Sequence, residues 1–169
     1  METNTNYIIS VKDLVKEYND GKVTALSHCN LDVKKGEVVA IIGPSGSGKS
    51  TLLRSLNLLE EPTSGEIFFE GVNLASKDVD INLHRQKMGM VFQDFNLLDN
   101  FSLKDNIFLP LVLSGVDYRD MEKRLAPIAS LLGIEKLLNK YPYEVSGGQK
   151  QRAAVARAII TNPELILAD

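Results

Sequence analysis

The chain has 169 residues, 44% of them hydrophobic and 24% charged, which is the balance of a soluble globular protein of one domain or of one domain and part of another. Its formal net charge of −3 gives no electrostatic support to nucleic-acid binding, and its single cysteine excludes an internal disulfide and fits a reducing compartment. No apolar run approaches a membrane span, and no basic start with an apolar stretch opens the chain, so we expect a cytosolic protein without a secretion signal.

Strand patterns dominate the first half of the chain. Residues 7–18 and 25–37 alternate apolar and polar side chains, which is typical of strands with one solvated face. Residues 38–42 (VVAII) are continuously apolar and β-branched, which predicts a strand covered on both faces, as in a parallel sheet. The segments 65–71 and 88–93 are predicted to form two further short strands.

Helical patterns follow. Residues 49–59 carry leucines on one helical stripe, and the stretch from about 95 to 144 is helical in character. Pro127 predicts a kink or a break there, because an interior proline costs a helix roughly 3 kcal/mol. A last helix is predicted over 146–162, with a serine cap and a proline just beyond it, before a closing strand at 165–168. The layout predicts a parallel α/β core with a helical insert.

The segment 43–51, GPSGSGKST, matches the phosphate-binding pattern G-x-x-x-x-G-K-[ST] at every position. Its glycines let backbone N–H groups surround a phosphate, and the helix that follows presents its positive end to the anion. Lys49 is placed to reach the β- and γ-phosphates, Ser50 offers a hydroxyl to Mg²⁺, and Thr51 lies within reach of the α-phosphate. A chance glycine-rich turn is the alternative, and the strand before the loop and the helix after it argue against that. The predicted nucleotide-binding residues of this loop are Gly43, Pro44, Ser45, Gly46, Ser47, Gly48, Lys49, Ser50 and Thr51.

The closing stretch LILAD ends in the carboxylate of Asp169. A Mg²⁺ ion held by phosphates and one hydroxyl needs another oxygen ligand, usually through water, and an acid at the end of a neighbouring parallel strand supplies it. We therefore predict that Asp169 and Ser50 face the same Mg²⁺ ion. The alternative is an acid that merely ends a strand.

The stretch SGGQ opens the last predicted helix. Ser146 and Gln149 form a capping-box pattern. Gly147 and Gly148 are unfavourable for helix stability, since each glycine lowers the stability of a helix interior by up to about 1 kcal/mol relative to alanine. A second phosphate bound at this bare helix start would offset that cost. A plain cap with tolerated glycines is the other interpretation.

The motifs VSGGQKQR, GPSGSGKST and LILAD, in this spacing, resemble the nucleotide-binding domain of ATP-binding cassette (ABC) transporters, from about Tyr7 to Asp169. The resemblance implies an α/β fold: a P-loop NTPase core with a parallel sheet, an N-terminal antiparallel β subdomain and a helical insert, here incomplete at its C-terminus. Residues 1–94 and 145–169 would form the ATP-binding core with the β subdomain, and residues 95–144 the helical subdomain.

In this family two such domains sandwich two ATP molecules head to tail. The resemblance implies that the signature residues Ser146, Gly147, Gly148 and Gln149 bind the γ-phosphate held by a second ATPase domain, identical or related. Gln93 matches the glutamine that touches Mg²⁺ or the attacking water and links ATP to the membrane subunit. Tyr18 matches the aromatic that stacks on adenine, with a half-buried strand tyrosine as the alternative. The implied catalytic residues are Lys49, Gln93 and Asp169, and the implied Mg²⁺ ligands are Ser50, Gln93 and Asp169, with ATP and Mg²⁺ as cofactors.

Family members continue past the aspartate with a glutamate that polarises the attacking water and, later, a switch histidine. Neither follows Asp169, and His28 and His84 both precede the signature, where we expect them to be a strand residue and a helix-surface residue. We therefore expect these 169 residues to bind MgATP weakly or not at all and to hydrolyse it far below the level of the family.

The resemblance implies an ATPase subunit that lies peripherally on the cytoplasmic face of the membrane. Its expected partners are transmembrane permease subunits, and nucleic acid is not an expected partner. The segments 56–71 and 84–97 are similar to ATPases of polar amino-acid importers, whereas 106–116, 141–152 and 162–169 are similar to bacterial exporters of peptide antibiotics or lipoproteins. A chimera joined near residue 96 and plain shared ancestry both stay open. A soluble ABC-type ATPase acting on nucleic acid or ribosomes, and a non-catalytic nucleotide-binding fragment, are the alternative functions.

Overall fold

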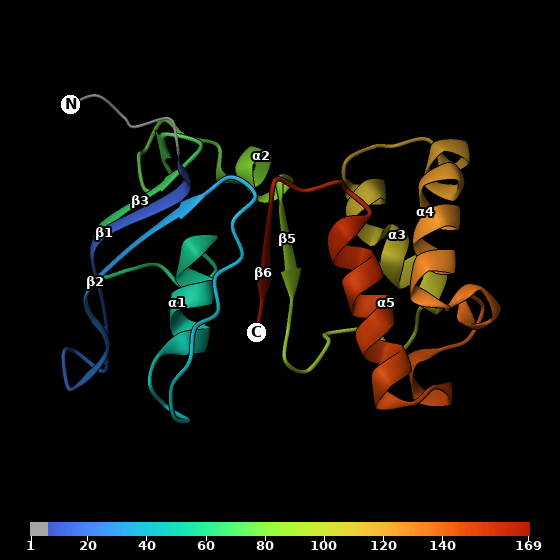
Figure 1. The fold of residues 1–169 in the computed structure, drawn as a ribbon, viewed down its shortest axis with the longest axis horizontal. Helices are drawn as coiled ribbons and strands as arrows, with labels where there is room; N and C mark the ends of the chain where they lie inside the picture. The colour runs from blue at the N-terminus through green and yellow to red at the C-terminus, as the bar shows by residue number, and fades with distance from the viewer. Residues whose placement is uncertain (1–6) are drawn as a thin grey trace. The chain divides into compact units, whose positions relative to one another are not determined.

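The computed structural model describes residues 7–169 (Figure 1). The first six residues, on which the expected absence of a secretion signal partly depends, lie outside the described residues. The chain divides into two units, one that ends at Arg85 and one that runs from Gln86 to Asp169. None of the described helices is long and apolar enough to cross a membrane.

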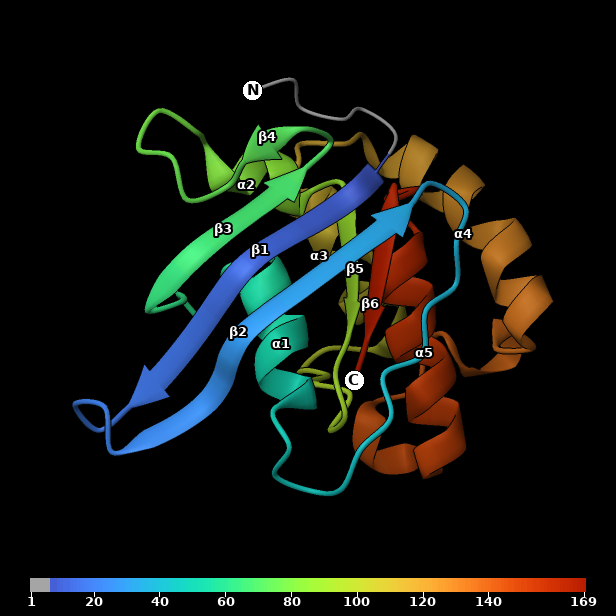
Figure 2. The same cartoon turned by 60° about the vertical axis from the view of Figure 1, so that its left-hand side comes forward.

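An antiparallel sheet with the strand order β2-β1-β3-β4 dominates the N-terminal unit (Figure 2). Its strands are β1 (Tyr7–Tyr18), β2 (Val23–Lys34), β3 (Ser64–Phe69) and β4 (Val72–Asn73). The predicted strands are confirmed, but their alternation is interrupted. Asp13 on β1 and His28 on β2 have positive φ angles of 51° and 49°, and the β1–β2 register shifts between Val11 and Leu14. These bulges twist the long strand pair locally.

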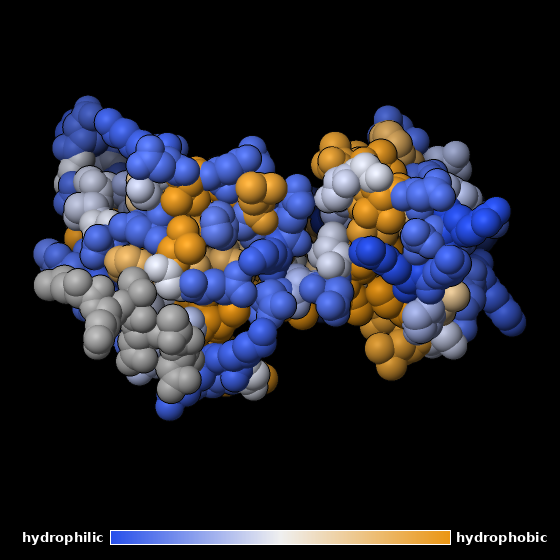
Figure 3. Space-filling model, turned by 90° about the horizontal axis from the view of Figure 1, so that it is seen from above, coloured by the Kyte–Doolittle hydropathy of each residue, from blue (hydrophilic) through white to orange (hydrophobic). Residues whose placement is uncertain are grey.

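The predicted strand at residues 38–42 is not formed. The segment has no strand pairing within residues 7–169, and the side chains of Val38 and Ile42 are 96% and 94% exposed. On the face that Figure 3 draws, apolar side chains lie at the surface among polar ones. A parallel strand exists only where neighbouring strands complete its hydrogen-bond ladder. The apolar composition therefore predicted the wrong local structure, because no described strand pairs with this segment.

Two helices belong to the N-terminal unit, α1 (Lys49–Leu56) and α2 (Ile81–Arg85). Helix α1 is shorter than the predicted 49–59, since Leu58 adopts a left-handed φ of 54°. The guanidinium of Arg85 donates to the carbonyl oxygens of Asn57 and Leu58, at 3.0 and 2.9 Å. This cation therefore satisfies carbonyl groups just past the negative end of α1.

In the C-terminal unit, strands β5 (Met88–Val91) and β6 (Leu165–Ala168) form a parallel pair (Figure 1). Helix α5 (Gly147–Ile159) packs against β5. A Cβ atom added at Gly89 would lie 2.4 Å from the carbonyl oxygen of Ala158. The helix and the strand approach this closely because residue 89 has no side chain.

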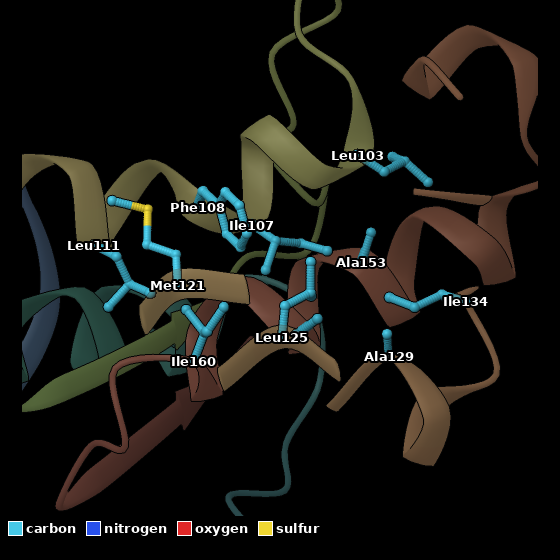
Figure 4. Packing of buried hydrophobic residues seen from close by; sticks show 11 residues of the cluster. Leu103, Ile107, Phe108, Leu111, Met121, Leu125, Ala129, Ile134, Ala153 and Ile160 are labelled. Carbon is cyan, nitrogen blue, oxygen red and sulfur yellow. The ribbon is translucent and has the colours of Figure 1, made fainter. Parts of the chain in front are cut away.

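Helices α3 (Leu103–Leu113) and α4 (Tyr118–Leu132) and the short 3₁₀ turns η1 (Glu135–Leu137) and η2 (Pro142–Glu144) complete the C-terminal unit. Their buried side chains meet α5 in one apolar cluster (Figure 4), made of Leu103, Ile107, Phe108, Leu111, Met121, Leu125, Ala129, Ile134, Ala153, Ala156 and Ile160. The helical character predicted for residues 95–144 is confirmed, while the subdomain boundaries stay a prediction.

A kink or a break was expected at Pro127, and the break is wrong because α4 continues through it, while the kink stays a prediction. Pro127 is exposed, and the residues on either side of it that face the core, Leu125 and Ala129, are each only 1% exposed. Burial of these side chains outweighs the local preference against proline, since tertiary packing supplies most of a helix's stability.

Asn106, in the first turn of α3, is a fully buried polar residue that bonds to the loop before this helix. Its Oδ1 accepts a hydrogen bond from the backbone N–H of Leu98 at 2.7 Å. Its Nδ2 group donates to the carbonyl oxygens of Leu98, Phe101 and Ser102 at 3.0, 3.2 and 3.0 Å. The side chain thus replaces water for a loop that would otherwise bury unpaired backbone groups.

A charged cluster links α3 to α4. The ammonium of Lys104 pairs with Glu122 and lies over the rings of Phe108 and Tyr118, and the Tyr118 hydroxyl donates to Glu122 at 2.7 Å. The hydrogen bonds from Lys104 and then from Tyr118 hold the pKa of Glu122 below its usual value. The carboxylate therefore stabilises the fold above its ordinary pKa, and this contribution is lost as the pH falls through the lowered pKa of the folded state.

We expect Glu122→Gln to lower the free energy of unfolding at pH 7 by no more than about 1 kcal/mol, since the pair is partly exposed. The difference from wild type should shrink toward zero as the pH falls below about 4. Urea denaturation at several pH values measures this. Glu135→Gln, which changes an exposed carboxylate, serves as the control. A difference in the free energy of unfolding between wild type and Glu122→Gln that is the same at pH 7 and pH 3 would contradict this role of the Glu122 carboxylate.

Candidate nucleotide site

The loop before α1 has the backbone shape predicted for a phosphate cradle. Gly46 and Gly48 have φ angles of 79° and 88°, a left-handed conformation that residues with a side chain rarely adopt. Gly48 is the N-cap of α1, and a Cβ atom there would lie 2.3 Å from the carbonyl oxygen of Ala25 on β2. Conformation and packing therefore both require glycine at residue 48, where the loop turns into the N-terminus of α1.

Lys49 begins α1 and folds back over the loop. Its Nζ atom donates to the carbonyl oxygens of Gly43 and Pro44, at 2.9 and 2.7 Å, and lies 3.4 Å from Oγ of Ser47. A fixed ammonium group therefore lies beside a helix N-terminus, whose free N–H groups also attract negative charge. Both features select an anion, and a phosphate fits them. Ser50 and Thr51 follow on the first turn of the same helix.

Tyr18, at the end of β1, lies beside this helix. Its hydroxyl donates to Oε2 of Glu60 at 3.0 Å, and the Nζ atom of Lys16 is 4.9 Å from its ring centroid. Burial and the neighbouring Glu60 raise the pKa of Tyr18, against a hydrogen bond with the side chain of Thr51. Tyr18 thus contacts a cradle residue, while its stacking on adenine stays a prediction, as does the alternative of a half-buried strand tyrosine.

Gln93 and Asp169 lie at one edge of the C-terminal unit. Strands β5 and β6 run parallel, with Val91 paired to Ala168, and the N–H of Asp169 donates to the carbonyl oxygen of Val91 at 3.0 Å. The structure therefore brings the two predicted metal ligands of this unit to the carboxyl ends of neighbouring strands. The cradle belongs to the other unit, so the sharing of one Mg²⁺ by Ser50 and Asp169 stays a prediction.

The start of α5 has the predicted capping box. Oε1 of Gln149 accepts from the N–H of Ser146 at 2.8 Å, and Oγ of Ser146 accepts from the N–H of Gln149 at 3.4 Å. Cβ atoms added at Gly147 and Gly148 would meet no heavy atom within 4 Å among the described residues. Packing in the described chain therefore does not explain the two glycines, and the second anion site and the plain cap both stay open as interpretations.

The two histidines lie outside the site. The Nδ1 atom of His28 is 2.6 Å from a carboxylate oxygen of Asp13, at the strand bulges. His84, expected on a helix surface, packs its ring edge-on against Phe69 and is partly buried, and its Nδ1 atom has no hydrogen-bond partner among the described residues. Within residues 7–169 no group of three or more His, Cys, Asp or Glu side chains is placed to hold a metal ion.

Arg157 on α5 was not predicted from the sequence. Its guanidinium donates to the backbone of the turn just after Gln93. Burial lowers the pKa of Arg157. The only sequence signal is an arginine among the buried alanines of the second half of this helix, and such a signal does not identify its partners.

A family model for the ABC transporter matches residues 26–169, most of the chain. The chain belongs to the ABC transporter family. This confirms the resemblance, and the fold is that of the family's nucleotide-binding domain. The antiparallel sheet and the helices described above are the parts of that fold present in residues 7–169.

Relatives in this family are similar over almost the whole chain. The uncharacterized ABC transporter ATP-binding protein YvcR of Bacillus subtilis (strain 168) is 50% identical over 168 residues, which cover 96% of this chain and 65% of that protein. The methionine import ATP-binding protein MetN 1 of Shouchella clausii (strain KSM-K16) is 46% identical over 165 residues, which cover 96% of this chain and 48% of that protein. The chain thus spans about half to two thirds of these ABC relatives.

Solved structures of ABC proteins share the fold. A dimeric, post-hydrolysis structure of the ATP-binding cassette MJ0796 bound to ADP and Pi has a TM-score of 0.86 at 37% identity, and the match covers 95% of this chain and 73% of that one. The cbiO1 protein from Clostridium perfringens, part of the ABC transporter complex cbiONQ, has a TM-score of 0.83 at 33% identity and covers 97% of this chain and 65% of that one.

Proposed function

We propose that this chain binds MgATP in the cradle 43–51 and is the ATP-hydrolysing part of an ABC transporter subunit that drives transport through transmembrane permease subunits at the cytoplasmic face of the membrane. The placement of the Lys49 ammonium supports this most strongly. It lies within a loop of left-handed glycines, at the start of α1. A solved relative that holds ADP and Pi, and relatives named for methionine import, support the same function.

The oxygen donors of the site suit Mg²⁺, a hard cation that prefers carboxylate, hydroxyl and carbonyl oxygens. Ser50, Gln93 and Asp169 are the proposed ligands. Bound Mg²⁺ would neutralise negative charge on the phosphates. Lys49 supplies further positive charge, and Gln93, at the same strand edge as Asp169, orients the attacking water. The weak or absent MgATP binding and the low turnover expected of residues 1–169 alone stay predictions, which nucleotide titration and phosphate release of the purified 169 residues measure. The binding tests proposed for the cradle use the full-length protein.

The second half of the proposed site comes from another ATPase domain, identical or related. Gly147 and Gly148 leave the N-terminus of α5 without β-carbons, and the described chain packs nothing against them. Such a bare helix start binds the γ-phosphate of a nucleotide held by the partner's cradle. The dimeric MJ0796 cassettes support the pairing of two such domains.

Mixing two variants tests the arrangement. We expect neither Lys49→Ala nor Gly148→Asp to dimerise with MgATP, because one loses a cradle charge and the other places a carboxylate at the phosphate position. Mixed together, the two variants form a dimer with one intact composite site. Energy transfer between populations labelled at their N-termini measures this mixed dimer.

The matched control carries both substitutions in one chain, mixed with wild type. In a head-to-tail dimer both sites of that pair are damaged, so the pair should give no energy transfer above background. If each chain instead completes its own site, the control pair keeps one intact site and the mixture of single variants keeps none. That reversed result would refute the head-to-tail proposal.

A further inference from the structure

Arg157 makes a bidentate contact between two segments of the C-terminal unit that are distant in sequence. From the third turn of α5, its Nη1 donates to the carbonyl oxygen of Asn96 at 2.6 Å, and its Nη2 donates to that of Phe95 at 2.7 Å. A guanidinium presents its donors in a fixed planar fork, so two bonds to consecutive carbonyls set the orientation of the turn as well as its distance from α5.

The turn that Arg157 holds has a disfavoured backbone. Phe95 and Asn96 have φ angles of 61° and 47°, two consecutive residues in the left-handed region. Asparagine tolerates this conformation, whereas a bulky residue such as phenylalanine adopts it rarely. The internal bonds from the N–H of Phe95 to Phe92 and from that of Asn96 to Asp94 also close the turn. Such a conformation persists where the surroundings hold it, and Arg157 is the contact that does so from outside the turn.

The turn begins directly after Gln93. Residue 93 therefore lies between two anchored points, the end of β5 on one side and the carbonyls held by Arg157 on the other. Helix α5 itself is fixed against β5 by the close approach at Gly89. The same helix carries Gly147 and Gly148 at its N-terminus, so one rigid element connects the signature to the turn beside Gln93.

We infer that Arg157 is a positioning residue, which fixes the turn at residues 94–96 and so directs Gln93 toward the nucleotide from the helix that carries the signature. The role of Gln93 in this inference rests on the proposed function. The geometric part, an anchored turn, does not.

Hydrogen exchange tests the geometric part without nucleotide. In Arg157→Met the amides of residues 95 and 96 should exchange at least about tenfold faster, as expected for the loss of charge-assisted hydrogen bonds. The amides within α5 should keep their wild-type rates. Arg157→Lys, which keeps the charge but not the fork, should lie in between. Arg152→Met, an exposed arginine on the same helix, is the control and should change nothing at residues 95 and 96.

Unchanged exchange at residues 95 and 96 in Arg157→Met would overturn the inference. So would faster exchange throughout α3, α4 and α5 in both Arg157→Met and Arg157→Lys, since that result shows a general packing role. The lysine variant keeps the aliphatic stem and the charge, and it decides the question if the methionine variant does not fold.

Kinetics of the full-length protein in its transporter complex test the link to Gln93. Arg157→Met should lower kcat about tenfold and change the KM for ATP less than about twofold, because the cradle is untouched and only the orientation of Gln93 is lost. A KM for ATP that rises about as much as kcat falls, or an unchanged kcat, would overturn the link between Arg157 and Gln93. If the wild-type protein neither binds nor hydrolyses ATP, the proposed function fails, and the exchange result still decides whether Arg157 anchors the turn.

Discussion

Lys49→Ala is expected to weaken MgATP binding by roughly 10- to 100-fold, since a hydrogen bond to a charged group contributes roughly 1.5–3 kcal/mol. The substitution removes the only side-chain ammonium that the described structure places inside the loop 43–51. The backbone N–H groups and the N-terminus of α1 remain and account for the residual affinity. Titration with a fluorescent ATP analogue measures the change.

The same ammonium also bonds to two loop carbonyls, so a loss of affinity could arise from a loosened loop. Thermal unfolding of Lys49→Ala controls for this and should show a change of only a few degrees. Lys77→Ala, which removes an exposed lysine of the same unit, should bind the analogue as wild type does. Wild-type affinity in Lys49→Ala would contradict the assignment of the cradle.

Asn106→Leu is expected to lower the free energy of unfolding by about 2 kcal/mol or more, although leucine has a similar shape. The amide of Asn106 is fully buried and satisfies the N–H and carbonyl of Leu98 and the carbonyl of Phe101. Leucine leaves the N–H of Leu98 and the carbonyl oxygen of Phe101 without this partner, whereas the carbonyl oxygen of Leu98 still accepts from the N–H of Phe101. Each group left unpaired costs about 1–3 kcal/mol. Urea denaturation followed by circular dichroism measures the loss.

Asn100→Leu is the matched control, because residue 100 is exposed in the same loop region. Its effect should lie within about 0.5 kcal/mol of zero. If Asn106→Leu changes the free energy of unfolding as little as Asn100→Leu does, the loop closes without the Asn106 side chain and the prediction is wrong.

Features that depend on local spacing were predictable from the sequence. The glycine pattern around Lys49 specifies a loop shape by itself, because left-handed backbone favours glycine. The spacing of Ser146 and Gln149 specifies a capping box in the same local way.

Features that depend on distant partners were not predictable. The apolar run 38–42 has the composition of a buried strand, but strand formation requires partners that composition does not supply. Pro127 stays in α4 because burial on either side of it outweighs local preference. Arg157 reaches a turn about sixty residues earlier in the chain, and no sequence period marks such a contact.

The most direct measurement of the central claim is a titration of the ¹⁵N-labelled full-length protein with MgADP, followed by amide chemical shifts. If backbone N–H groups of the loop hold the β-phosphate, the largest shifts appear at Gly46 to Thr51 and saturate with one nucleotide per chain. Shifts that are absent there, or that gather on another surface, would contradict the claim that this loop binds the nucleotide.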